Sequence, residues 1–220
     1  MNFKHLAAAC TLLATAPAFS ATLVSDTFTP QQSGWSVSAA VGADFLGRFN
    51  NTNAPAPFNV TGATLSFTAP AAGAGTVSFD LLAFNTLDDN NCCTDVLTFI
   101  GGGTAFSGYF AGYRMNAAST SSNVSFSIAM NGNVSVLGGN GQDRPQSYTV
   151  TLPVTLLAGL NSFSWTYSGL QDYGDESWGL DNVLITGPDG GTAVVPVPGA
   201  ALLLATGLAG FGFAARRRKA

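Results

Sequence analysis

Apolar and small polar residues alternate in short runs along most of this chain of 220 residues. The alternation is regular in residues 124–130, 148–156 and 163–167. Successive side chains of a β-strand point to opposite faces of a sheet, so a period of two indicates strands with one buried face. No stretch of residues 21–190 keeps a helical period. The pattern therefore predicts an all-β domain over residues 21–190.

The gaps between these runs are rich in Gly, Ser, Thr and Asn, which favour turns. Asn131-Gly132 stands between two alternating runs, and this dipeptide is typical of a tight β-hairpin. About ten short strands at this spacing predict an antiparallel β-sandwich, in which two sheets pack face to face. We expect a jelly-roll-like arrangement, with an immunoglobulin-like sandwich as the alternative.

The end of the chain has a different composition. An apolar stretch fills residues 199–215, and a helix over it is roughly 25 Å long at about 1.5 Å per residue, slightly short of a bilayer core of about 30 Å. The preceding Pro-containing linker, residues 191–198, and snorkelling cations make up the difference. We expect residues 199–220 to form a transmembrane helix with a basic tail on the cytoplasmic side. The linker contains Val195, Pro196, Val197 and Pro198, and the tail contains Arg216, Arg217, Arg218 and Lys219.

The N-terminus has the pattern of a signal peptide. Lys4 and His5 precede an apolar segment, and Ala18-Phe19-Ser20 is a small-x-small cleavage site. The apolar segment is too short to remain as a membrane span. We expect a signal-peptide helix over residues 1–20, cleavage near Ser20 or at the neighbouring Ala16-x-Ala18 site, and export across the inner membrane.

The C-terminal tail resembles the PEP-CTERM sorting signal of Gram-negative bacteria, which combines a V-P-x-P motif, a Gly/Ala/Leu-rich span and a basic end. Here Val197 stands between Pro196 and Pro198, where the family usually has Glu. The resemblance implies an exosortase-type sorting enzyme as a partner, a transient stay in the inner membrane, and a final place at the cell surface or in the extracellular matrix.

The domain between the two signals is strongly acidic. The chain has eight Lys and Arg and twelve Asp and Glu. Five of the eight cations lie in the signals and all twelve acids lie in the domain, so the formal charge of residues 21–190 is −9. A domain of this charge repels nucleic acids, which argues against nucleic acid as a partner.

Histidine and cysteine are scarce. The only histidine, His5, belongs to the signal peptide, so the domain has no Ser-His-Asp triad, no Cys-His pair and no His-ligated zinc site. Its two cysteines, Cys92 and Cys93, are adjacent and form a vicinal disulfide, an intermolecular bridge or a pair of free thiols. Without a nucleophile motif, we expect a protein that is not an enzyme.

Carboxylates gather in two segments. Calcium binds six to eight oxygens from carboxylates, amides and backbone carbonyls. Residues 172–182 with Asp26 offer such ligands, and Asp88, Asn90 and Asp95 offer a second set. The alternative for both sets is hydrogen bonding to nearby backbone. The Ca2+ ligands predicted for the first set are Asp26, Asp172, Asp175, Glu176 and Asp181.

Three segments, Thr149–Leu156, Gly159–Tyr167 and Asp175–Val183, resemble the C-terminal half of jelly-roll domains of the carbohydrate-binding and galactose-binding-like type. The resemblance implies a β-sandwich with polysaccharide as a partner. A sugar ring stacks on a surface aromatic ring beside polar groups. We expect Tyr173 to be the best such platform. The aromatic candidates are Trp35, Tyr109, Tyr113, Trp165, Tyr167, Tyr173 and Trp178, of which Trp165 and Trp178 are expected in the core.

These features predict an exported, non-catalytic surface or extracellular-matrix protein, sorted by a PEP-CTERM signal and associated with exopolysaccharide. One alternative is a calcium-dependent carbohydrate-binding module. The other is an extracellular glycan-active enzyme, which requires two facing carboxylates.

Overall fold

Strands and the loops between them make up the described structure. The computed structural model describes residues 20–38, 44–51, 53, 56, 59–85, 87, 95–110, 118–121, 127–133 and 146–190. Among these residues, no helix is long and apolar enough to cross a membrane. The strands are β1 (Ser20–Asp26), β2 (Leu46–Phe49), β3 (Gly62–Ala69), β4 (Gly73–Asn85), β5 (Val96–Gly101), β6 (Thr104–Tyr109), β7 (Ala118–Ser121), β8 (Ser127–Asn133), β9 (Gln146–Leu156), β10 (Gly159–Ser168) and β11 (Glu176–Pro188).

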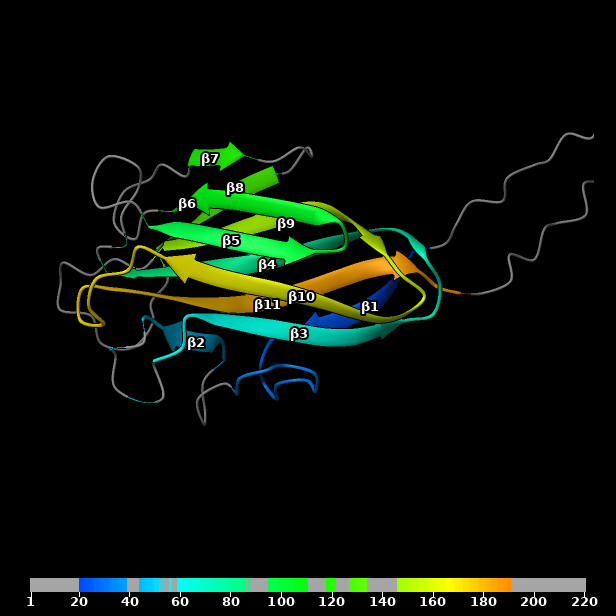
Figure 1. The fold of residues 1–220 in the computed structure, drawn as a ribbon, viewed down its shortest axis with the longest axis horizontal. Coiled ribbons are helices and arrows are strands. Elements are labelled where there is room, and N and C mark those ends of the chain that lie inside the picture. The colour runs from blue at the N-terminus through cyan, green and yellow to red at the C-terminus, as the bar shows by residue number, and fades with distance from the viewer. Residues whose placement is uncertain are drawn as a thin grey trace, which may run out of the picture. The chain divides into compact units, whose positions relative to one another are not determined.

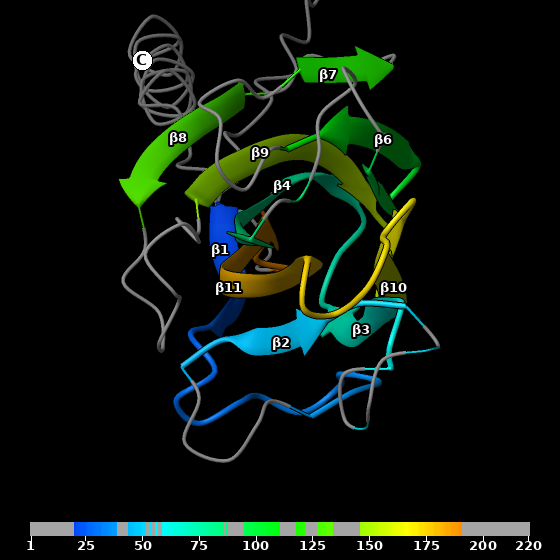
Figure 2. The same cartoon turned by 90° about the vertical axis from the view of Figure 1, so that its left-hand side faces the viewer.

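The strands form two antiparallel sheets (Figure 1). Sheet A has the order β1-β11-β4-β9-β8, with β2 also paired to β11, and sheet B has the order β3-β10-β5-β6-β7. The two views in Figures 1 and 2 show the sheets as two layers. The predicted all-β, antiparallel sandwich is therefore confirmed.

Strands far apart in the sequence pair with each other. β1 pairs with β11, β3 with β10, β4 with β9, and β5 with β6. Each pair lies inside the previous one along the chain, and successive pairs alternate between the two sheets. Closing such long loops costs entropy, so burial of the strand faces between the sheets has to stabilise the pairing.

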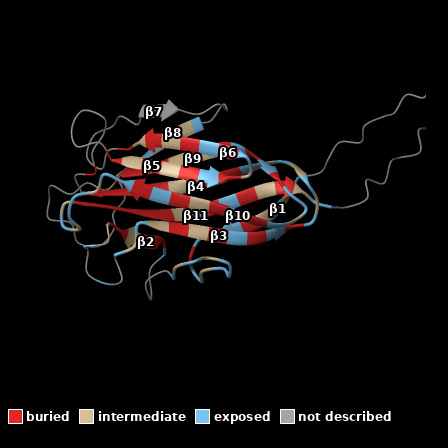
Figure 3. Ribbon diagram, viewed as in Figure 1, coloured by how far each residue is buried: buried red, intermediate tan, exposed pale blue. Residues whose placement is uncertain are grey.

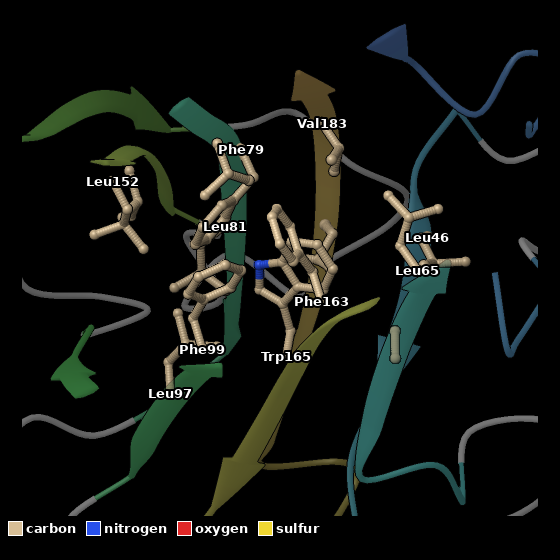
Figure 4. Close-up of a cluster of buried hydrophobic side chains, with 14 of the residues drawn as sticks. Leu46, Leu65, Phe79, Leu81, Leu97, Phe99, Leu152, Phe163, Trp165 and Val183 are labelled. Carbon is tan, nitrogen blue, oxygen red and sulfur yellow. The ribbon is translucent and has the colours of Figure 1, made fainter. Parts of the chain in front are cut away.

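Alternate residues of the long strands are buried between the sheets (Figure 3). Trp165 of β10 is fully buried and packs edge-on against Phe79 of β4, with ring centroids 5.7 Å apart. Phe99 of β5 and Phe163 of β10 contact the same indole (Figure 4). Each aromatic contact contributes about 0.5–1.5 kcal/mol beyond the burial of the rings. The period of two in the sequence is thus the alternation between this core and the outer faces.

The hairpin turn predicted at Asn131-Gly132 is wrong. Both residues lie in β8, which pairs with β9, and the register shifts between Met130 and Gly132. Such a shift marks a β-bulge, which glycine favours. Asn131 Nδ2 donates to Thr149 Oγ1 of β9 at 2.7 Å. Pairing with β9 therefore keeps the dipeptide extended.

Phe19–Gly190 form one compact unit. Residues 1–19 and 191–220, which hold the predicted signal peptide, sorting motif, transmembrane helix and basic tail, lie outside the described residues.

Candidate functional site

Asp26, the predicted metal ligand at the end of β1, is 1% exposed. Its Oδ1 accepts the backbone N–H of Phe28 at 2.8 Å. Its Oδ2 accepts the backbone N–H of Gln32 at 2.9 Å and the indole N–H of Trp35 at 2.8 Å. The carboxylate thereby closes the loop after β1 and holds the Trp35 ring 5.4 Å from that of Trp165. Three N–H donors satisfy the carboxylate oxygens of Asp26. The role that these contacts give Asp26 is therefore structural.

The loop between β10 and β11 closes on itself. Asp172 Oδ1 accepts the backbone N–H groups of Gly174 at 2.8 Å and Asp175 at 3.1 Å, which makes an Asx turn. Asp172 is exposed, whereas Glu176 is fully buried and its Oε2 accepts the backbone N–H of Gln171. In the part of the chain that the structure describes, no three His, Cys, Asp or Glu side chains gather as a metal site.

Asp181 lies on the outer face of sheet A, directly opposite Asp80 of β4. Asn182 has a positive φ of 49°, and the register of β11 shifts beside it. Its Nδ2 donates to Asp80 Oδ2 at 2.8 Å and to Asp181 Oδ2 at 3.3 Å, so one amide bridges two carboxylates. Partial burial, together with the negative charges of Asp80, Asp44 and Asp26, raises the pKa of Asp181.

Several aromatic candidates belong to the core. Trp165 and Trp178 are fully buried, as predicted, and Tyr167 is 4% exposed. Trp35 is half-buried against the core, and Tyr113 lies outside the described residues.

Tyr173, the predicted sugar platform, is half-buried and lies against Arg48 of β2. The guanidinium carbon of Arg48 is 4.9 Å from the centroid of the Tyr173 ring and 5.1 Å from that of Phe84, within cation–π range. Arg48 Nε also donates to Ser177 Oγ at 2.5 Å. These contacts attach the β10–β11 loop to β2 and β4. One face of the Tyr173 ring is therefore already in contact with Arg48.

The outer face of sheet B carries hydroxyl groups and no charge. None of the residues in its five described strands is charged. Thr166 of β10 lies beside Thr98 of β5, whose Oγ1 is 3.3 Å from Ser107 Oγ of β6. Half-buried Tyr109 follows on the same face of β6. We call the outward residues of β3, β5, β6 and β10 the hydroxyl face: Thr64, Ser66, Thr68, Val96, Thr98, Ile100, Ala105, Ser107, Tyr109, Leu160, Ser162, Ser164, Thr166 and Ser168.

Sequence reasoning did not single out the hydroxyl face, although part of the signal is visible in the sequence. Phe163, Trp165 and Tyr167 point inward, so the residues between them point outward. That four strands present such residues side by side follows only from the strand order.

No protein-family model matches this chain, and no curated protein matches it. Among solved structures, it is similar to a family 35 carbohydrate-binding module from an environmental isolate. That alignment covers 79% of this chain and 94% of the other, with 13% sequence identity and a TM-score of 0.32. A likeness at this score carries no inference about the ligand of this chain.

The end of the sandwich where β10 leads into β11 lies on the left in Figure 1 and toward the viewer in Figure 2. Buried polar side chains come from the strand ends there. Sheet A contributes Glu176 and Gln146, the first residues of β11 and β9. Sheet B contributes Tyr167 of β10 and Asp95, which precedes β5. Asn50, which follows β2, donates a hydrogen bond to the backbone carbonyl of Glu176. All five side chains are at least nine-tenths buried, and we call them the loop-end cluster.

The second predicted acidic set is described only at Asp95. Asp88, Asn90, Cys92 and Cys93 lie outside the described residues. The sequence marked Asp95 and Glu176 as members of two separate sets, and it marked neither Asn50 nor Gln146. Alternation with inward-facing Tyr148 is the one signal that places Gln146 inside.

Proposed function

We propose that this chain is an exported, non-catalytic protein of the cell surface or extracellular matrix that associates with exopolysaccharide. The observation that carries the proposal is the hydroxyl face, an uncharged sheet surface on a domain with a formal charge of −9. A hydroxyl-rich neutral polymer exchanges hydrogen bonds with such a surface, and no charged side chain has to lose its hydration there. The predicted signal peptide and PEP-CTERM tail support export, sorting by an exosortase-type enzyme and a transient stay in the inner membrane.

We also propose that the sandwich is a jelly roll. The strand orders β1-β11-β4-β9 and β3-β10-β5-β6 support this assignment, because four nested strand pairs shared between two sheets are the pattern of that fold. Strands β2, β7 and β8 add to these eight.

The positions of the carboxylates support a non-catalytic role. A glycosidase needs two carboxylates that both reach the scissile bond of a bound sugar. Asp95 and Glu176 are fully buried. Asp80 and Asp181 are tied to the amide of Asn182 on the outer face of a sheet.

Affinity electrophoresis of the full-length protein, in gels that contain neutral or anionic polysaccharide, tests the proposal. We expect neutral polysaccharide to retard the protein. Thr166→Asp places a charge in the middle of the hydroxyl face and should weaken binding at least about tenfold, which is about 1.4 kcal/mol. The matched control is Thr151→Asp, which places the same charge on the outer face of sheet A. Absence of retardation by every polysaccharide, or equal loss in both variants, contradicts the proposal.

A further inference from the structure

Two buried polar atoms of the loop-end cluster have no hydrogen-bond partner: Asn50 Oδ1 and Tyr167 Oη. Asn50 is fully buried and Tyr167 is 4% exposed. Buried polar atoms nearly always have a partner, which is often an ion or a water molecule when no protein group is near. These two atoms therefore point to a bound species at this end of the sandwich.

Two buried carboxylates, those of Asp95 and Glu176, belong to the same cluster as the unpartnered atoms. Asn50 Nδ2 donates to the backbone carbonyl of Glu176 at 2.5 Å, so the other atom of this amide lies beside the start of β11. Burial, followed by the negative charge of Asp95, the neighbouring Tyr148 and the charge of Glu176, raises the pKa of Tyr167. Ser168 pairs with Val96, so Asp95, which precedes Val96, lies beside the end of β10 that carries Tyr167.

We propose that the loop-end cluster is a calcium site, with Asp95, Glu176, Asn50 and Gln146 as its side-chain ligands. Calcium takes six to eight oxygens from carboxylates, amide carbonyls, backbone carbonyls and water. The four side chains supply two carboxylates and two amide oxygens: Glu176 and Gln146 begin β11 and β9, Asp95 precedes β5, and Asn50 follows β2. The two carboxylates match the charge of the ion, and the Tyr167 hydroxyl would donate to a water on the ion.

Oxygen ligands of this kind favour calcium over other common metals. Zinc prefers Cys and His, and the cluster contains neither. Magnesium requires near-ideal octahedral geometry and keeps several waters. These side chains lie in or next to strands of two sheets, whose positions are fixed by strand pairing. The bound ion would tie the two sheets together where the nested strand pairs open into loops.

Calorimetry and melting of the full-length protein, stripped with EDTA and then supplied with Ca2+ or Mg2+, test the site. We expect heat of binding with Ca2+ and a Tm increase of roughly 5–10 °C when calcium exceeds its Kd about a hundredfold. Mg2+ should bind more weakly. Tb3+, a luminescent substitute for Ca2+, should emit when tyrosine and tryptophan are excited, because Tyr167 and Trp178 lie beside the site with ring centroids 5.6 Å apart.

Four variants test this site, and three of them separate it from the first sequence-predicted set, which shares only Glu176 with it. Glu176→Gln and Asp95→Asn each remove one negative ligand and should weaken calcium binding at least about tenfold. Asn50→Asp adds a negative ligand, so it should tighten calcium binding while lowering the Tm in EDTA. Asp181→Asn removes a carboxylate of the sequence-predicted set from the outer face of sheet A and should leave the Kd unchanged.

Two results would overturn the proposal. One is a wild-type protein with no binding heat, no Tm shift and no Tb3+ emission. The other is a calcium Kd that stays at the wild-type value in Asp95→Asn and Asn50→Asp, variants that remain decisive if Glu176→Gln does not fold. Either result leaves the polysaccharide proposal standing, because that proposal rests on the opposite surface of sheet B.

Discussion

Asp181 and Asp80 place two carboxylates directly opposite each other on sheet A. Burial, followed by the neighbouring carboxylates, raises the pKa of Asp181, so the folded state takes up a proton more readily than the unfolded chain. The free energy of unfolding therefore falls as the pH rises from the ordinary aspartate pKa through the raised value. Above that window the repulsion between the carboxylates is fully present.

Asp181→Asn should therefore stabilise the domain at neutral pH by about 0.5 kcal/mol, a value reduced by solvent screening of this half-exposed side chain. The gain should shrink as the pH falls through the same window, because Asp181 is then protonated. Thermal melts across the acid range measure the difference. A gain that is the same at every pH would refute the repulsion between the carboxylates.

The substitution Asp26→Ala measures how much Asp26 contributes to the stability of the domain. Asp26→Ala leaves the N–H groups of Phe28, Gln32 and Trp35 without their acceptor. Unsatisfied buried donors cost about 1–3 kcal/mol each, so we expect a loss of at least about 2 kcal/mol in the free energy of unfolding. Urea unfolding monitored by tryptophan fluorescence measures it.

Asp172→Ala is the matched control for Asp26→Ala, because it also removes a turn-capping carboxylate. Its Asx turn is exposed, so water replaces the lost acceptor and the expected cost is below about 1 kcal/mol. Equal costs for the two variants would mean that Asp26 is not the buried anchor of its loop.

At the scale of the strands, Gly75 of β4 leaves no room for a side chain against β11. A Cβ at this position would lie 2.3 Å from the backbone oxygen of Thr186 and 3.1 Å from Leu156 Cδ1. A backbone oxygen in a ladder cannot move without disturbing the pairing. Gly75→Ala should lower the free energy of unfolding by at least about 2 kcal/mol, seen as a lower urea midpoint.

Gly174→Ala is the control for Gly75→Ala. Its nearest neighbour would be Asp172 Oδ1 at 3.2 Å, in an exposed loop that has room to adjust. We expect a change within about 0.5 kcal/mol. A similar loss in both variants would point to a general effect of alanine rather than to the close strand approach.

The strands that alternate were the predictable ones. β9 and β10 carry a buried residue at every second position, so their ranges were visible in the sequence. β2, which pairs with β11, was not predicted from the sequence. Leu46–Phe49 is only four residues long and most of its residues are buried, so it shows no alternation. Asn131-Gly132 was misassigned, because pairing with β9 outweighed the local preference for a turn.

At the scale of the whole molecule, five of the eight cations lie in the two terminal signals, which affects where the processed domain can be held. The predicted tail contains four cations, and the domain is acidic. If an exosortase removes the tail, the released domain has no basic segment to hold it at an anionic membrane. We therefore expect mass spectrometry of the mature protein, from a host with an exosortase, to show a chain without Arg216–Lys219.

Replacing Pro196 and Pro198 together by Ala should abolish this processing, and the uncut protein should stay with the membrane fraction. A mature wild-type chain that still ends in the basic residues would contradict the sorting prediction. The same change in Pro188, a proline in β11 outside the motif, should leave the cleavage intact.

The sequence by itself determined the class of fold, the absence of charge from particular strands and the acidity of the domain. These are properties of single segments, since strand alternation and charge are local. Only the tertiary structure decided which strands meet. It gathered hydroxyls from β3, β5, β6 and β10 on one face, and it brought Asp95 and Glu176 from different sheets to one end of the core. Pairing such as that of β1 with β11 depends on burial across the whole chain, which no local pattern encodes.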